Sequence, residues 1–328
     1  MGTVVQINHV TKKFPGVIAL DDITFDIQAS EVHVLLGENG AGKSTLMKIL
    51  SGVYQPTSGE MIIDGKSYGK LSPKESYELG ISIIYQELSL INELSIMENM
   101  FVGKLPTIKK MGIPVVDYDL MMKKTCEAMN TVGLKCNPRE LVENLSISEK
   151  QQCEIAKAII ANSRVIIMDE PTTSLTLSET AKLFEIIRNL KAHGKGLVYI
   201  SHKMEEIKQI GDRVTVLKDG FNVDTLDVND TNEDDLINMM VGRSVENMYE
   251  IERIVPGDIV LGVKNLSSGK TFQDINFNVK KGEIFGMYGL VGSGRTEIVR
   301  SIFGADSKES GTITVKGQEV DFKSPKDA

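Results

Sequence analysis

The sequence predicts an α/β fold: a mainly parallel sheet with an antiparallel β-subdomain and a helical subdomain. Three observations support this fold. Short apolar runs of strand length recur between helical stretches, as buried parallel strands do. A glycine-rich loop, GENGAGKST at Gly37–Thr45, lies between such a run and a helical stretch. The segment from about 95 to 162 is mainly helical in pattern, which predicts an inserted helical subdomain.

The individual strands and helices follow from local patterns. Val4–Val10 and Ile23–Ile27 alternate apolar and polar residues, as strands with one exposed face do. A helix is expected from near Ser178 to about Gly194, and Asp219-Gly220 predicts a hairpin turn. Buried parallel strands are predicted at Val32–Leu36, Ile81–Tyr85, Val165–Met168 and Leu197–Ile200.

The glycine-rich loop matches GxxxxGK[ST], the Walker A phosphate-binding motif, and has a strand before it and a helix after it. Its glycines let the backbone N–H groups point at nucleotide phosphates. Lys43 can then reach the terminal phosphates, and the Ser44 hydroxyl can ligate Mg²⁺. A plain glycine-rich turn is the alternative. The predicted nucleotide-binding residues are Gly37, Glu38, Asn39, Gly40, Ala41, Gly42, Lys43, Ser44 and Thr45.

Two acidic residues follow the apolar run Val165–Met168 at the end where open α/β sheets bind phosphates. Asp169 can hold Mg²⁺, directly or through water, and Glu170 can polarise an attacking water. A surface acidic pair is the alternative. His202 follows the next predicted strand, where it can sense a γ-phosphate or simply face solvent. Gln86 can contact the metal or the attacking water.

The chain also contains an internal repeat that stops early. Gly37 aligned on Gly289 sets an offset that holds without a gap to Ser72-Pro73-Lys74, which falls on Ser324-Pro325-Lys326. The last residue then corresponds to Ser76, and the first copy's later residues have no counterpart. A second core without most of its sheet should not be a complete hydrolysing unit, so we expect part of a longer protein.

The repeat predicts the domain organisation. A first domain is expected at 1–240, with its helical subdomain at about 95–162, then a linker at 241–258 and the beginning of a second domain at 259–328. The stretch from Phe221 to Asp258 is acidic and weakly apolar, which indicates the connection between the copies. A helix is expected near Asp234–Val241 within it.

Composition excludes several classes of protein. The 328 residues carry a net charge of −8 and no long Lys/Arg block, which argues against nucleic acid as a partner. No apolar run is long enough to span a bilayer, and the N-terminus lacks the pattern of a signal peptide. We therefore expect a cytosolic chain, or one docked on a membrane component.

Together the motifs resemble an ABC-transporter ATPase, a P-loop NTPase. They are GENGAGKST at Gly37–Thr45, YQE around Gln86, LSISEKQQ at Leu145–Gln152, MDEPTTSL at Met168–Leu175 and SHK around His202. The duplicated layout and the second loop, GLVGSGRTE at Gly289–Glu297, resemble the two-domain ATP-binding subunits of bacterial monosaccharide importers. This group imports ribose, galactosides, xylose and allose. The segments LSISEKQ and IPVVDYD resemble the allose-type member most.

The resemblance implies a role for each motif. Phe14 would stack on adenine, although burial in the core is the alternative for this residue. Gln86 would couple the metal site to the membrane subunit. Asp169 would bind magnesium, Glu170 would be the catalytic carboxylate and His202 the switch histidine. The signature segment, which grips ATP held by the opposite domain, would comprise Leu145, Ser146, Ile147, Ser148, Glu149 and Gln151.

The implied function is ATP binding and hydrolysis with Mg²⁺, energising import of a ribose-, galactose- or allose-like sugar. The implied partners are membrane permease subunits and an extracytoplasmic sugar-binding protein, with ABC domains dimerising within or between chains. The implied location is the cytoplasmic face of the cell membrane. A non-transport ABC ATPase of the translation or DNA-repair type is one alternative. A fragment that only binds nucleotide is another.

Four departures from the family pattern bear on activity. Ile147 and Ser148 stand where the signature LSGGQ has glycines, adding side-chain bulk where close approach to phosphate is needed. Arg295 replaces the lysine of the second loop, and Thr176 stands where an aspartate often follows. The equivalent of Phe14 falls in the short Ser267–Lys270 turn. The resemblance therefore implies one competent ATP site and one that binds or hydrolyses poorly.

Overall fold

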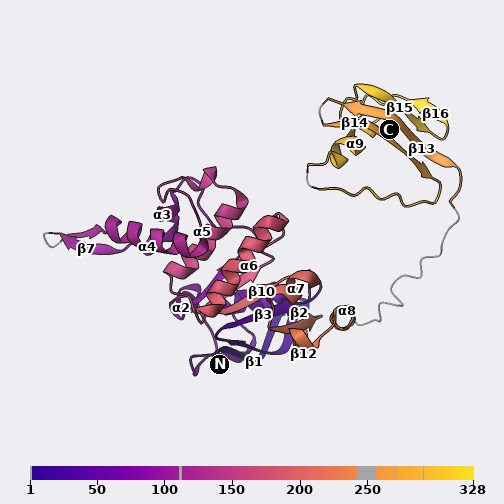
Figure 1. The fold of residues 1–328 in the computed structure, drawn as a ribbon. Helices are drawn as coiled ribbons and strands as arrows, with labels where there is room; N and C mark the ends of the chain where they lie inside the picture. Colours follow the sequence, from indigo (N-terminus) through magenta and orange to yellow (C-terminus); the bar gives the residue numbers. More distant parts are fainter. Residues whose placement is uncertain (1, 111–112, 242–255, 270, 291) are drawn as a thin grey trace. The chain divides into compact units, whose positions relative to one another are not determined.

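A computed structural model describes residues 2–110, 113–241, 256–269, 271–290 and 292–328 of the chain (Figure 1). The chain divides into two compact units, residues 1–248 and 249–328, and each has its own sheet and core. Most of the predicted linker at 241–258 lies outside the described residues, so the predicted domain boundaries stay a prediction. No helix that the structure describes combines the length and apolar character needed to cross a bilayer.

The centre of the first unit is a six-stranded sheet in the order β12-β11-β3-β10-β9-β6. Five of these strands run parallel, and β12 pairs antiparallel at one edge. Each of the four predicted parallel strands is present, with ends that differ by one residue at most. The strands are β3 (Glu31–Leu36), β6 (Ile81–Ile84), β9 (Val165–Asp169), β10 (Gly196–Ile200), β11 (Arg213–Lys218) and β12 (Phe221–Asp227).

An antiparallel sheet in the order β2-β1-β4-β5 forms the second layer, as the alternating pattern predicts. Its strands are β1 (Thr3–Phe14), β2 (Val17–Gln28), β4 (Ser58–Ile63) and β5 (Lys66–Tyr68). Helix α1 (Lys43–Leu50) packs between the two sheets. Its Leu46 and Ile49 share one buried cluster with Ile7 of β1 and Ile167 of β9. This cluster fixes the start of α1 against the end of the parallel sheet.

Helices cover the other face of the parallel sheet, where Ile166 of β9 and Tyr199 of β10 share a cluster with the helical part. The predicted helix after β9 is confirmed as α6 (Leu177–Ala192). The other helices are α2 (Pro73–Glu78), α3 (Ile96–Met100), α4 (Tyr118–Val132), α5 (Ile147–Ile160), α7 (Met204–Ile210) and α8 (Glu233–Val241), with 3₁₀ turns at Val142–Asn144 and Val228–Asp230.

Two segments of the first unit contain features that were not predicted. The segment from about 95 to 162 is mainly helical, as predicted, but it also contains the hairpin of β7 (Thr107–Lys110) and β8 (Ile113–Val116), which projects beside α4 (Figure 1). Its β-branched residues favour strands over helix. Phe221 does not begin a connection, since it opens strand β12, which the predicted hairpin turn joins to β11. The predicted helix near Asp234–Val241 is confirmed as α8, whose Leu236 is buried against the sheet.

The second unit repeats the antiparallel layer of the first. Its strands, in the order β14-β13-β15-β16, correspond to β2-β1-β4-β5. They are β13 (Ile259–Ser268), β14 (Phe272–Lys280), β15 (Ser310–Val315) and β16 (Gln318–Val320), and they are accompanied by α9 (Arg295–Ile302). Ile284 and Tyr288, which occupy the place of β3 in the repeat, are fully exposed. The second unit therefore has no parallel sheet among its described residues.

Candidate active site

The glycine-rich loop joins the end of β3 to the start of α1. Gly42 caps α1 with φ of 104°, a left-handed conformation that favours glycine. A Cβ atom at this position would lie 2.6 Å from Leu20 Cδ2 and 2.7 Å from the Ala19 carbonyl oxygen, so the loop needs a glycine here. No side chain caps the helix, which leaves the N–H groups of its first turn for an anion.

Lys43 lies folded inside this loop and is only 9% exposed. Its ammonium group donates hydrogen bonds to the carbonyl oxygens of Gly37, at 2.7 Å, and Glu38, at 2.9 Å. Burial lowers the pKa of Lys43, while the carboxylates of Glu170, Asp169 and Glu38 oppose this shift. The positive charge is thus held at the loop, with two acids of a neighbouring strand close by.

A cavity of about 230 Å³ opens in front of the loop. It brings together most of the residues predicted from separate motifs, and it adds Ala19 of β2, which no motif indicated. The lining residues are Ala19, Asn39, Gly40, Gly42, Lys43, Ser44, Thr45, Gln86, Asp169 and Glu170. Gly37, Glu38 and Ala41 belong to the same loop but do not line the cavity.

Asp169 ends β9, and in the sheet register it lies beside Ile200, the last residue of β10. Burial and the neighbouring Glu170 raise the pKa of Asp169, while Lys43 and Lys48 oppose this shift. The hydroxyl of Ser44, the amide of Gln86 and the carboxylate of Asp169 thus offer oxygen ligands from three segments.

This set of oxygen ligands fits Mg²⁺, which usually takes one or two carboxylates and completes its octahedron with waters and substrate phosphates. Among the described residues there is no group of three or more His, Cys, Asp or Glu side chains that could hold a metal alone. A cation here would therefore bind together with a phosphate ligand.

Glu170 adopts a φ of 44°, a strained conformation for a residue with a side chain. Its N–H donates to the carbonyl oxygen of Ile200 at 3.1 Å, which ties it to β10. Its carboxylate lies 3.2 Å from Nδ1 of His202. His202 is 58% exposed at its side chain and does not line the cavity, so it meets the site through Glu170.

Phe14 lies half-buried at the end of β1 and does not line the cavity. Its ring packs edge-on against Tyr54, with centroids 5.3 Å apart, and the Lys12 ammonium lies 4.8 Å from its centre.

The signature segment lies away from this cavity, at the start of α5. Ser146 caps the helix and forms a reciprocal capping box with Glu149, whose carboxylate accepts from the Ser146 N–H at 2.8 Å. Leu145 is buried, Ile147 is 53% exposed, and Gln151 donates to the Pro171 carbonyl oxygen at 2.7 Å. Within the first unit, the segment does not touch the cavity of its own loop.

Fold and site together define a P-loop domain of the ATP-binding cassette class. The chain resembles the crystal structure of an ABC-transporter cassette in its ADP conformation, with a TM-score of 0.64, 20% identity and coverage of 74% of this chain and 100% of that one. It also resembles a dimeric cassette bound to ADP and Pi after hydrolysis, with a TM-score of 0.59, 25% identity and coverage of 68% and 98%.

The sequence comparisons identify the family. The ABC transporter model matches residues 20–173 and 272–328, and the chain belongs to this family. The chain is 44% identical over 328 residues to the ribose import ATP-binding protein RbsA 1 of Rubrobacter xylanophilus. It is also 44% identical over 324 residues to the galactose/methyl galactoside import ATP-binding protein MglA of Clostridium tetani. It spans 65% and 64% of the length of these relatives, and 100% and 98% of the chain is matched.

Proposed function

We propose that the chain is part of an ATP-binding, ATP-hydrolysing subunit that energises import of a monosaccharide through a partner permease. The observation that carries this proposal is the convergence of Lys43, Asp169 and Glu170 on one cavity in front of the N-terminus of α1. A buried cation, an unpaired helix start and two carboxylates suit a magnesium-bound triphosphate. Few other ligands combine these demands.

In this proposal each side chain has one task. The N–H groups of the loop bind the phosphates, and Lys43 exchanges its two carbonyl contacts for phosphate oxygens. Ser44, Asp169 and Gln86 would hold Mg²⁺, and the bound ion would supply neutralisation of charge at the phosphates. Glu170 orients and polarises the attacking water, and His202 acts through its contact with Glu170. Catalysis is then mostly positioning and charge stabilisation.

Replacing the water-polarising carboxylate tests this function. Glu170→Gln should lower ATP turnover by about 100-fold or more, while affinity for Mg·ATP stays within about twofold, because the loop is untouched. Glu185→Gln, on the exposed face of α6, is the matched control and should turn over normally. Normal turnover in Glu170→Gln would refute the assignment.

The transport half of the proposal rests on the relatives, whose names specify ribose and galactose or methyl galactoside import. A ribose-, galactose- or allose-like sugar is the proposed cargo, bound by other subunits. The proposed location is the cytoplasmic face of the membrane, with a permease and an extracytoplasmic sugar-binding protein as partners. The relatives favour this function over translation or DNA repair.

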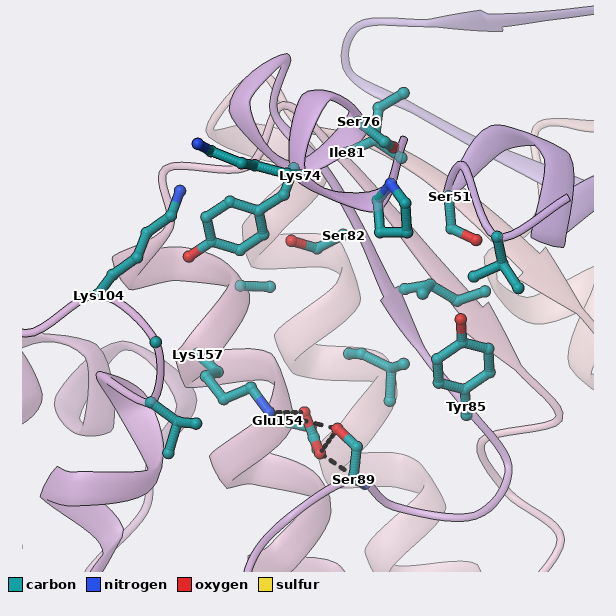
Figure 2. A pocket seen from close by; sticks show the side chains of 18 of the residues that line it. Ser51, Lys74, Ser76, Ile81, Ser82, Tyr85, Ser89, Lys104, Glu154 and Lys157 are labelled. Atoms are coloured by element: carbon teal, nitrogen blue, oxygen red, sulfur yellow. Dashed lines mark hydrogen bonds and ion pairs between the residues drawn. The ribbon is translucent and has the colours of Figure 1, made fainter. Parts of the chain in front are cut away.

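We infer that the permease docks in a groove of about 400 Å³ between the parallel sheet and the helical part (Figure 2). The groove is mainly apolar, and Tyr85 in its wall precedes Gln86 of the nucleotide site. Figure 2 shows Lys74 and Lys104 at one side of the groove and the bonded trio of Glu154, Lys157 and Ser89 at another. A partner bound in the groove can therefore shift Gln86 at the metal site through its neighbour Tyr85.

Charge placed in this groove should block docking. Val53→Glu and Val102→Glu, at positions 49% and 55% exposed, should reduce co-sedimentation with permease-containing vesicles at least tenfold and leave Mg·ATP affinity unchanged. Val223→Glu, at a position 44% exposed on β12, is the control. Unchanged co-sedimentation of both groove variants would exclude this docking site.

The departures in the signature and in the second loop belong to this proposal as well. Ile147 and Ser148 add bulk at the start of α5, and Arg295 stands at the start of α9. A site that uses the altered signature or the altered second loop would bind or hydrolyse ATP poorly, and the loop at Gly37–Thr45 would form the competent one. Weak turnover by this chain that rises in a full-length protein would separate a binding-only fragment from an inactive one.

A further inference from the structure

Helix α7 carries a buried carboxylate, Glu206, that does not line the nucleotide cavity. Its residue is only 6% exposed. It is nevertheless fully partnered. Four groups converge on its two oxygens: Thr172 Oγ1 at 2.6 Å, Tyr199 OH at 2.7 Å, Ser201 Oγ at 3.0 Å and Lys203 Nζ at 3.0 Å.

These partners come from the two segments that carry the reactive pair. Thr172 lies two residues after Glu170, and Ser201 immediately precedes His202. The Thr172 hydroxyl bonds Oε1 of Glu206, and the Ser201 hydroxyl bonds Oε2. One carboxylate therefore joins the exit of β9 to the exit of β10.

The link is rigid because its members are themselves buried. Thr172 and Ser201 are each 3% exposed, and Tyr199 is 1% exposed. A buried carboxylate is stable only where hydrogen-bond donors surround it. The charge of Glu206 therefore holds these donors in place. The hydrogen bonds from Thr172 and the other donors lower the pKa of Glu206 despite the opposing effect of burial, which keeps it ionised.

The reactive pair needs such support. Glu170 holds a left-handed backbone conformation that costs free energy and persists only where its surroundings enforce it. Its contact with His202 spans 3.2 Å between side chains on different segments, and His202 is largely exposed. The sheet pairing of Asp169 with Ile200 and the N–H bond of Glu170 to Ile200 join the strand ends, and the Glu206 cluster joins the residues that follow them.

We propose that Glu206 is a positioning residue for hydrolysis, which sets the placement of Glu170 against His202 by holding Thr172 and Ser201 in one cluster. This inference rests on the proposed function, because its kinetic consequence is a loss of ATP turnover. Glu206 itself touches neither nucleotide nor metal. Its action passes through the two segments that it joins.

The first test compares Glu206→Gln with Glu205→Gln, the same change on the exposed neighbouring residue. A neutral amide cannot accept from all four donors, so the two segments should separate slightly. A displacement of about 1 Å at a reacting group can cost 100-fold in rate. We expect kcat to fall 10- to 100-fold in Glu206→Gln, with KM for Mg·ATP within twofold, and no change in Glu205→Gln. Equal kcat in the two variants overturns the proposal.

A second variant covers the case in which Glu206→Gln fails to fold. Thr172→Val removes one hydroxyl at nearly constant volume and should lower kcat in the same way. If both variants fold, their combined effect on kcat should be smaller than the product of the single effects, because both break one link. Fully multiplicative effects on kcat would show that the two residues do not act through one link. A lower melting temperature with normal kcat per folded molecule would assign the cluster to stability alone.

A third measurement separates this inference from the proposed function. The chain has four histidines, so the imidazole signals of His202 can be assigned in the nucleotide-free protein by comparison with His202→Ala. These signals should shift in Glu206→Gln and stay unchanged in Glu205→Gln, whether or not the chain hydrolyses ATP. Absence of turnover in the wild type would count against the proposed function. An unmoved His202 signal would count against the role of Glu206.

Discussion

Three charged side chains at the cavity depend on one another. Burial lowers the pKa of Lys43 and raises the pKa of Asp169, so the fold disfavours the charged form of each. Each charge is tolerated because Lys43 and the two acids, Asp169 and Glu170, face one another. In the absence of nucleotide such a site stores unfavourable free energy that a bound phosphate and cation can relieve.

The pH dependence of stability follows from Asp169. Its pKa is raised above the ordinary 3.8, so the folded protein holds the proton more tightly than the unfolded chain does. The resulting destabilisation is absent below pH 3.8 and fully present above the raised pKa. Asp169→Asn should therefore raise the melting temperature of the nucleotide-free protein at pH 7, and about 1 kcal/mol would correspond to about 2–4 °C.

The gain should shrink as the pH is lowered toward the ordinary aspartate value, and Mg·ATP should no longer stabilise the variant. Calorimetry across this pH range measures both effects. Asp230→Asn, at an exposed position, is the control and should leave the melting temperature unchanged. A lower melting temperature for Asp169→Asn at pH 7 would show that its attraction to Lys43 outweighs the cost of burial.

The glycine-rich loop at Gly37–Thr45 leads to a prediction about side-chain bulk. Gly42 and Gly65 both have positive φ, but only Gly42 has backbone and side-chain atoms where a Cβ would lie. Alanine at either position adds left-handed strain of about 1–2 kcal/mol. Gly42→Ala should cost more than Gly65→Ala in urea unfolding and should also weaken Mg·ATP binding, which Gly65→Ala should not. Equal losses in both variants would mean that strain alone matters at Gly42.

For single residues, the sequence predicts which side chains carry a reactive group better than it predicts which side chains lie next to them. The loop residues, Gln86 and the acid pair could be recognised because each motif follows a strand whose end is fixed by the sheet. Ala19 carries no chemical signal, and its place in the wall depends on how β2 crosses α1. Glu206 likewise has no motif, since its role depends on donors up to 34 positions away.

Among the secondary-structure elements, the reciprocal capping boxes mark where several helices begin. Four helices in the described part of the chain start with Ser or Thr followed three residues later by Glu. The box of α5, Ser146 with Glu149, lies on the signature segment, whereas the box of α2, Ser72 with Glu75, does not. The two boxes are therefore matched in local structure and differ in proposed function.

Removing each cap separates stability from function. Ser146→Ala and Ser72→Ala should each lower the free energy of unfolding by about 1 kcal/mol, measured in urea. Neither variant should change ATP turnover per folded molecule by more than about twofold, because the signature segment is proposed to serve the poorly hydrolysing site and not the loop at Gly37–Thr45. A tenfold loss of turnover in Ser146→Ala alone would contradict that assignment of the signature.

Strand positions could be predicted because parallel strands are buried on both faces and leave continuous apolar runs. All six residues of β3 are buried, as expected for a central strand covered on both faces. The β7–β8 hairpin escaped because it lies on the surface, where Ile113 is 64% exposed and no alternation marks a buried face. The hairpin turn at Asp219-Gly220 indicated the start of β12, but the rest of this edge strand was not predicted, because only its pairing with β11 keeps it in the sheet.

At the scale of the whole molecule, the two units differ in the size of their hydrophobic cores. The first unit contains three buried clusters, which join two sheets to their helices. The second has one cluster of five buried hydrophobic residues, namely Val263, Leu266, Phe272, Ile298 and Ile313. Ile284, Tyr288 and Leu290 in that unit are 80% exposed or more.

This asymmetry predicts that residues 1–248 fold and bind nucleotide alone. Every residue that lines the cavity lies before position 171, and the buried clusters of the first unit contain no residue beyond 248. The isolated unit should unfold in one cooperative transition and bind Mg·ATP with a Kd within about twofold of the 328-residue chain.

Residues 249–328 alone should bind an apolar dye, because their small core leaves large side chains in water. Calorimetry and dye fluorescence measure these outcomes. A much weaker Kd for residues 1–248 would contradict this prediction, because the first unit would then not bind nucleotide by itself.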